Sequence, residues 1–179
     1  MKPGRNARDG RDMRIQALSV KQPWAYAILR LGKNVENRTW WTPYRGDLVI
    51  HAPKTRDDRH SYHAIREIMQ AGMGIPAWHE DELLQELGAI VGVVELVDVV
   101  QRHQGSRWAE TPDRLGRPYH WLLRNPRVLP EPIPARGFQG LWEPTVDDLR
   151  EIGRQLAGDR KHIGARQGPQ LSLFGGAAR

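Results

Sequence analysis

At 179 residues with no cysteine, the chain is long enough for one hydrophobic core and short for two, and it can form neither disulfides nor thiolate metal sites. No segment approaches the roughly 18 consecutive apolar residues that span a bilayer, and the first residues lack the apolar centre of a signal peptide, so the sequence predicts a soluble, cytoplasmic protein. A net charge of +6, carried mostly by arginine, favours nucleic acid over a membrane as partner, although a general bias toward arginine would give the same composition.

The N-terminal part of the chain predicts an arm, a strand and a helix. Residues 1–13 are polar and basic, as is typical of a flexible arm. Residues 14–20 alternate as a first strand does, and 22–32 predicts a short helix with Pro23 in its first turn and Gly32 at its end. The helical spacing places four side chains toward the core: Trp24, Ala27, Ile28 and Leu31.

A second strand is expected directly after this helix, from Lys33 to Arg38, because β-favouring residues follow it. Alternation along this strand would place Lys33 on one face and both Glu36 and Arg38 on the other. Since neighbouring strand residues point to opposite faces, at most one of Trp40 and Trp41 is expected to be buried.

The middle of the chain alternates between turns, strands and helices. A turn over 42–46 leads to an apolar strand over 48–52, and 56–87 carries two helical stripes separated by a break. The valine-rich run 88–100 predicts a central strand, in which Gly92 marks a bulge.

The C-terminal part predicts further strands and one helix. Residues 119–125 read as a strand, while the prolines of 127–137 restrict that segment to a sheet edge or an extended crossing. Residues 140–144 would close the core, and Thr145 caps a helix that is expected to end at Ala157. Five or six strands with few helices indicate an α+β fold, a small mixed β-barrel with short helices around it.

Several segments resemble one family in the order that the family shows. They are LSVKQPWA, KNVENRTW, TPYRGDLVIHA, GVVELVDV and NPRVLPEPIPARGFQGLW. Together they resemble an ASCH domain of the PUA-like superfamily, most closely the cointegrator-type branch, over about 14–142. The resemblance implies a PUA-like small mixed β-barrel and an ASCH domain over 14–156. It also implies a function in RNA or DNA binding or in nucleotide-directed hydrolysis.

The same resemblance implies a cleft lined by a GxKxxExR motif. The lysine, glutamate and arginine of that motif fall on Lys33, Glu36 and Arg38, whereas its leading glycine position holds Leu31 and glycine follows as Gly32. In a nucleic-acid-binding cleft, Glu36 would accept from a base edge, Arg38 would orient Glu36 or bind phosphate, and Lys33 would contact phosphate or a carbonyl. A salt-bridged strand face of purely structural value is the alternative.

Other residues near the motif complete the predicted nucleic-acid-binding set, in which an unburied tryptophan would stack on a base. They are Trp40, Trp41, Tyr44, Arg45 and His51. If the site is catalytic instead, Lys33 would act as base or nucleophile together with Glu36. One family branch that acts on acetylated cytidine carries threonines where this chain has Asn34 and Glu36.

Other conspicuous side chains receive structural interpretations. Trp24, Trp121 and Trp142 lie in apolar patterns and are expected in the core. Asp98 lies within the central strand, so it would need a partner at a cleft wall or from a loop amide. His60 and His63 have no evident third ligand, so neither a metal site nor a cofactor is predicted.

The tail over 157–179 is rich in glycine and charge and is expected to be disordered. Within it, QLSLF resembles the bacterial sliding-clamp-binding motif, and a hydrophobic peg that packs on this domain or on a copy of it is the alternative. The docking residues would be Gln170, Leu171, Leu173 and Phe174.

The sequence thus predicts a protein that reads an unpaired or extruded base of RNA or DNA and is tethered to the replication clamp. There are two alternatives. One is a hydrolase, either a ribonuclease or an amidohydrolase on modified nucleosides, and the other is a pure adaptor. The oligomeric state stays open.

Overall fold

A computed structural model describes residues 14–55, 86–103, 105–109 and 119–163. The predicted basic arm, the two helical stripes with His60 and His63, and the clamp-binding-like motif lie outside the described residues, except that the second stripe ends inside them. Within these residues, no helix is long and apolar enough to cross a bilayer.

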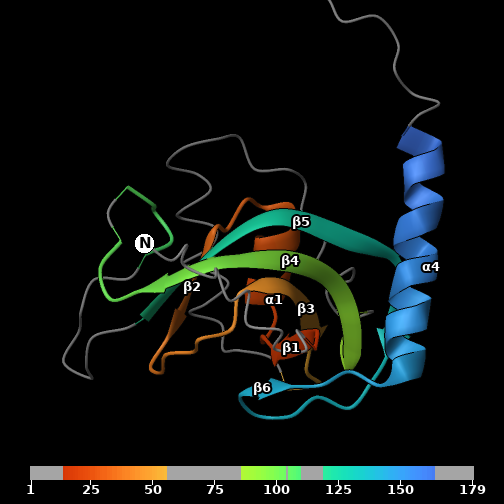
Figure 1. The fold of residues 1–179 in the computed structure, drawn as a ribbon, viewed down its shortest axis with the longest axis horizontal. Coiled ribbons are helices and arrows are strands. Elements are labelled where there is room, and N and C mark those ends of the chain that lie inside the picture. Colours follow the sequence, from red (N-terminus) through yellow and green to blue (C-terminus); the bar gives the residue numbers. More distant parts are fainter. Residues whose placement is uncertain (1–13, 56–85, 104, 110–118, 164–179) are drawn as a thin grey trace, which may run out of the picture.

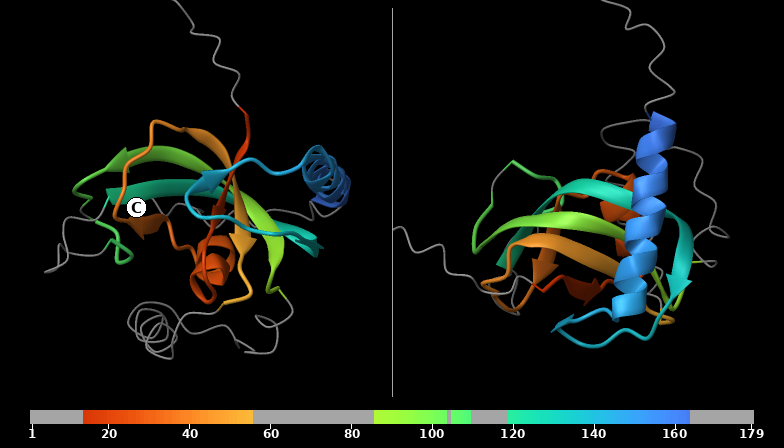
Figure 2. Two further views of the ribbon diagram at one scale, coloured as in Figure 1. Left: turned by 90° about the horizontal axis from the view of Figure 1, so that it is seen from below. Right: turned by 45° about the vertical axis from the view of Figure 1, so that its right-hand side comes forward.

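Six strands form one strongly curved sheet in the order β2-β5-β4-β3-β1-β6 (Figure 1). All neighbouring strands run antiparallel except β1, which pairs in parallel with β3. The sheet curls into a half-barrel, which confirms the predicted α+β class and strand number (Figure 2). The strands are β1 Gln16–Ser19, β2 Val35–Arg38, β3 Gly46–Ala52, β4 Ala89–Val100, β5 Tyr119–Pro134 and β6 Leu141–Trp142.

Helix α1, Trp24–Arg30, lies under the arch of the sheet and fills its concave side (Figure 2). Its buried Ala25, Ile28 and Leu29 pack with the inward-facing residues of β3, β4 and β5 to form the main core. Burial of this apolar face stabilises a helix that is too short to be stable alone. Helix and sheet are therefore held together by one continuous core beneath the arch.

Gly92 allows α1 and β5 to approach the central strand closely. A Cβ atom at this position would lie 2.6 Å from Cδ2 of Leu29 and 2.7 Å from the carbonyl oxygen of Arg127. The pairing of β4 with β5 also shifts register between Ile90 and Gly92. The predicted irregularity at Gly92 is confirmed. Glycine is needed at this position because a side chain would collide with Leu29 of α1 and with the backbone of β5.

The two segments predicted separately over 119–125 and 127–137 are joined in the single long strand β5. Strand β2 pairs with β5 only from Tyr119 to Leu122. The proline-rich end of β5 therefore has β4 on one side and no β2 partner on the other. Proline is accommodated there because the strand has edge character, as the sequence predicted.

Helix α4, Val146–Ile163, stands beside the far end of β5 (Figure 1). Thr145 begins it with a reciprocal cap, in which the Asp148 N–H donates to Thr145 Oγ1 at 3.1 Å and the Thr145 N–H donates to Asp148 Oδ2 at 3.0 Å. Its Ile152 packs into a second core cluster against Leu129 of β5. The helix does not end at Ala157 as predicted, so the first part of the predicted disordered tail, 157–163, is helical.

Candidate functional site

A cleft of about 1000 Å³ opens where the ends of several elements meet on the α1 side of the sheet. Its lining comes from the end of β1, from α1, from β2, from the segment after β3, and from segments 107–109 and 137–140. These residues are Ser19, Val20, Lys21, Trp24, Lys33, Glu36, Asn37, Arg38, Trp40, Pro53, Thr55, Arg107, Trp108, Ala109, Gly137, Phe138, Gln139 and Gly140.

Lys33, Glu36 and Arg38 form an ion-paired triad in this cleft. Lys33 Nζ donates to Glu36 Oε2 at 2.8 Å, and Arg38 Nη2 lies 3.1 Å from Glu36 Oε1. The Lys33 side chain is only 3 % exposed, and its ammonium also donates to the carbonyl oxygen of Val35. Each carboxylate oxygen of Glu36 thus has its own cation.

Backbone geometry brings Lys33 to Glu36, although alternation had predicted opposite faces for the two. Strand β2 begins only at Val35, and Gly32 has a φ of 70° that turns the chain out of α1. The Lys33 N–H donates to the carbonyl oxygen of Ala27, so Lys33 belongs to the helix end rather than to the strand. The face assignment was wrong because period-two alternation applies only inside the strand.

The triad fixes the charge of Glu36. Burial alone would raise the pKa of Glu36, but the charges of Lys33 and Arg38 and the hydrogen bonds that they donate hold it below the usual value of 4.5. At neutral pH the carboxylate is therefore ionised and can only accept hydrogen bonds. Arg38 also donates from Nη2 to the carbonyl oxygen of Ser19 at 3.0 Å, while its Nε is buried without a partner in the described part of the chain.

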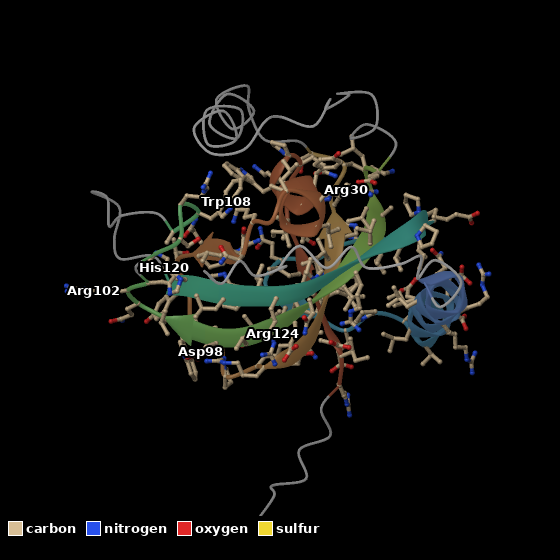
Figure 3. The ribbon with its side chains drawn as sticks, turned by 90° about the horizontal axis from the view of Figure 1, so that it is seen from above. Arg30, Asp98, Arg102, Trp108, His120 and Arg124 are labelled. Atoms are coloured by element: carbon tan, nitrogen blue, oxygen red, sulfur yellow. The ribbon has the colours of Figure 1, made fainter. Side chains whose placement is uncertain are left out.

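Three tryptophans form aromatic parts of the cleft lining. Trp40 is half-buried and meets Trp121 edge to face, with 4.6 Å between the ring centroids. Trp24 was predicted in the core; it packs against the core but also lines the cleft, with Lys33 Nζ 5.6 Å from its ring centroid. Trp108 is buried and lines the cleft near α1 (Figure 3), whereas Trp121 and Trp142 are buried as predicted.

Four predicted binding residues lie outside the cleft lining, and three of them, Trp41, Tyr44 and Arg45, precede β3. Trp41 is 52 % exposed, while the Tyr44 hydroxyl donates to the carbonyl oxygen of Asp47 and so holds the turn before β3. Arg45 pairs with Asp98 at 2.8 Å and is thereby engaged outside the cleft. Asp98 was expected to be buried, but it is exposed, and its Oδ1 also accepts from the N–H of Val99.

His51, the last predicted binding residue, is buried behind the cleft wall rather than exposed in it. Its Nδ1 lies 3.2 Å from Ser19 Oγ, and its Nε2 lies 3.2 Å from the carbonyl oxygen of Ala135. Burial lowers the pKa of His51, although the contact with Ala135 opposes that shift. In the neutral ring, Nε2 donates to Ala135 and Nδ1 is left as the acceptor that faces Ser19.

Comparison with known proteins gives the family. The family model described as ASCH domain matches residues 18–132, which is more than half of the chain. The chain belongs to the ASCH domain family. It is similar to human Activating signal cointegrator 1, with 26 % identity over 127 residues, and to the mouse protein of the same name, with 25 % identity over 127 residues.

Each of these matches covers 70 % of the chain but only 22 % of the relative, so the chain spans about a fifth of the length of these proteins. A crystal structure of ASCH from Zymomonas mobilis is similar with a TM-score of 0.51 and 15 % identity, covering 80 % of this chain and 96 % of that one. This likeness shows that the two proteins share the fold.

Charge is distributed unevenly over this ASCH domain. Among the described residues, the cleft lining contains four cationic side chains and one acidic one, a difference of three positive charges: Lys21, Lys33, Arg38 and Arg107 against Glu36. Arg124 and Asp98 lie on the other side of β4 and β5 from Trp108 (Figure 3). There three arginines are each paired with an acid: Arg45 with Asp98, Arg124 with Glu95 and Arg127 with Asp47.

One wall of the cleft, which residues 137–140 form between β5 and β6, was not predicted from the sequence. Phe138 in this wall is 54 % exposed. The available signal was the pair of glycines, Gly137 and Gly140, around Phe138 within a segment that already resembled the family. Among the described residues, no cluster of histidine and acidic side chains could hold a metal ion.

Proposed function

We propose that this ASCH domain binds nucleic acid and reads an unpaired or extruded base in the cleft. The observation that carries the proposal is Glu36, an ionised acceptor held in place by Lys33 and Arg38 inside a positively charged, aromatic-lined cleft. A nucleotide offers the matching parts: N–H donors on the base edge, a flat surface for stacking, and a negative phosphate.

Each member of the triad has a distinct part in this proposal. Glu36 accepts hydrogen bonds from the base, and Arg38, which orients Glu36 and whose side chain is 24 % exposed at the cleft, contacts a phosphate or a base carbonyl. Lys33 positions Glu36, because its ammonium is buried and already donates to two oxygen atoms. The exposed Lys21 and Arg107 at the cleft supply phosphate contacts.

The test is the affinity of the full chain for labelled single-stranded RNA, single-stranded DNA and duplex DNA across a salt series. Arg38→Ala and Glu36→Gln are expected to weaken single-strand binding about tenfold or more, since each removes a charge-assisted contact. Arg124→Ala, an exposed arginine on the opposite side of the sheet, is the matched control and should bind as the unmodified protein does. Unchanged affinity in both cleft variants, with folding verified by thermal unfolding, would contradict the proposal.

A hydrolase that uses the same cleft is the second candidate, and the contact between Lys33 and Glu36 is the observation in its favour. Hydrolysis of RNA or of acetylcytidine that is lost in Lys33→Ala would establish it. Burial of the Lys33 ammonium between Glu36 and the carbonyl oxygen of Val35 favours the binding proposal instead, since the nitrogen is not presented to a substrate.

For the C-terminal segment we propose a tether to the bacterial sliding clamp. The motif begins at Gln170, shortly after α4 ends at Ile163, so it would follow the helix on a short connection. Capture of the full chain on an immobilised bacterial clamp should be lost in the double variant Leu173→Ala, Phe174→Ala, whereas Arg38→Ala should be captured normally. Capture that survives the double variant would remove this proposal.

A further inference from the structure

We propose that Phe138 is the surface on which the base stacks inside the cleft, and that its wall is held ready for binding by Ser19 and His51. This inference rests on the proposed function and names the residue that would bind the face of the base, while Glu36 binds its edge.

Exposure distinguishes Phe138 from the other aromatic residues of the cleft. Trp108 is only 6 % exposed, and Trp24 and Trp40 are half-buried parts of the core packing. Phe138 is 54 % exposed although it lines the cleft. A large apolar ring left open to water costs free energy in the unbound protein, and a stacked base would cover it.

The ring of Phe138 has supporting neighbours. Its ring and that of Trp142 meet in an edge-type arrangement, with 5.6 Å between the centroids and 63° between the planes. The guanidinium of Arg136 lies 5.5 Å from the centroid of the same ring. The guanidinium lies over one face of the ring, so a base would stack on the other face, and the positive charge suits the negative phosphate that follows the stacked base.

The backbone of this wall is held by polar contacts from Ser19 and from the buried His51. Ser19 Oγ lies 3.0 Å from the carbonyl oxygen of Phe138 and can donate its one hydroxyl proton either to that oxygen or to Nδ1 of His51, whose Nε2 lies 3.2 Å from the carbonyl oxygen of Ala135. The Ala135 N–H in turn donates to the carbonyl oxygen of Gly88 at 3.1 Å. The wall itself is thus bound to β1, and the residue two positions before it is bound to β3 and to the residue that precedes β4.

Gly137 shows how closely the wall lies on these groups. A Cβ atom there would be 2.3 Å from both Cε1 and Nδ1 of His51, and 2.6 Å from Ser19 Oγ. The backbone therefore rests directly on the imidazole, which leaves no room for a side chain. A wall fixed in this way loses little conformational freedom when a ligand binds, so the stacking contact contributes to affinity more fully.

The test measures binding of the full chain to a labelled single-stranded oligonucleotide and to a matched oligonucleotide that lacks its bases. Phe138→Ala should weaken binding to the base-containing strand about tenfold, as expected for one lost stacking contact, while Phe138→Trp should retain it. Phe138→Leu keeps apolar bulk without the flat ring and should resemble Phe138→Ala. All these variants should bind the base-free strand with equal affinity. The control is Val146→Ala, which truncates another exposed apolar side chain and should leave both affinities unchanged.

The other outcomes separate this inference from the proposed function. If Arg38→Ala weakens binding but Phe138→Ala and Phe138→Leu do not, the stacking inference is overturned and the proposed function stands. If Trp41→Ala weakens binding while Phe138→Ala leaves it unchanged, the base stacks on Trp41, and the inference about Phe138 is overturned. An equal loss for the base-free strand would mean that Phe138 does not bind a base. If no cleft variant changes affinity, the proposed function itself falls.

Discussion

Lys33 and Glu36 are buried charges whose mutual contact keeps each from being an unpaired ion. The Lys33 side chain is 3 % exposed, and Glu36 also receives Arg38. Removing one member of a buried pair generally destabilises a protein strongly, whereas replacing both members by apolar side chains is often neutral. The triad should therefore show strong energetic coupling.

Lys33→Met is expected to lower the free energy of unfolding by about 3 kcal/mol, because Glu36 would lose its more buried partner. Adding Glu36→Leu to Lys33→Met should recover much of that loss, since no buried charge of the pair then remains. Urea denaturation of the two single variants and the double variant measures the coupling. Strictly additive effects would contradict the view that the two charges depend on each other.

The lowered pKa of Glu36 gives a prediction for stability at acid pH. A carboxyl group whose pKa is lower in the folded than in the unfolded protein stabilises the fold above its unfolded pKa. For Glu36 this contribution is complete above the usual value of 4.5 and is lost as the pH falls through the lowered folded value. The free energy of unfolding should accordingly fall more steeply below pH 4.5 in the unmodified protein than in Glu36→Gln, which cannot titrate there.

Helix α4 contains a glycine that its structure does not require. A Cβ atom at Gly153 would meet nothing within 4 Å, and the residue lies inside the helix. Gly153→Ala should therefore raise the free energy of unfolding by about 1 kcal/mol. Thr145→Ala removes the cap and should lower it by about the same amount. Thermal unfolding measures both changes, and a destabilising Gly153→Ala would show that α4 is not held as described.

Patterns within single elements predicted the helices and strands well. The valine-rich run became β4, and the apolar spacing of α1 correctly buried Ala27, Ile28 and Leu31, because burial on one face imposes such periodicities. The relation of Lys33 to Glu36 could not be predicted in the same way. It depends on a turn at Gly32 that places Lys33 outside the period of β2.

The sequence did not predict the part of the site that comes from residues distant along the chain. The cleft wall at Phe138 meets β1 through a hydrogen bond from Ser19, and no local pattern reports such a contact. Conversely, Tyr44 and Arg45 are close to the triad in sequence, yet the cleft lining does not include them. Proximity along the chain was taken for proximity in space.

The uneven charge of the whole domain predicts how salt affects binding. Excess positive charge lies in the cleft, whereas on the other side of the sheet arginines such as Arg124 are paired with acids. Lys21→Ala and Arg107→Ala should each reduce the slope of log affinity against log salt by about 0.7 for a single strand, as one phosphate contact is lost. Arg124→Ala should leave the slope unchanged, and an equal reduction in that variant would mean that binding extends beyond the cleft.

The strand order also determines when this cleft can exist during synthesis. Strand β2, which contains Glu36 and Arg38, pairs in the described structure only with β5, where Glu36 lies opposite Trp121. Strand β5 leaves the ribosome long after β2, and the wall with Phe138 follows later still. Until then the nascent chain carries Glu36 and Arg38 on a strand without its β5 neighbour. We therefore expect that a fragment ending before Tyr119 forms no binding cleft, and that the domain cannot be divided at its middle without losing the site.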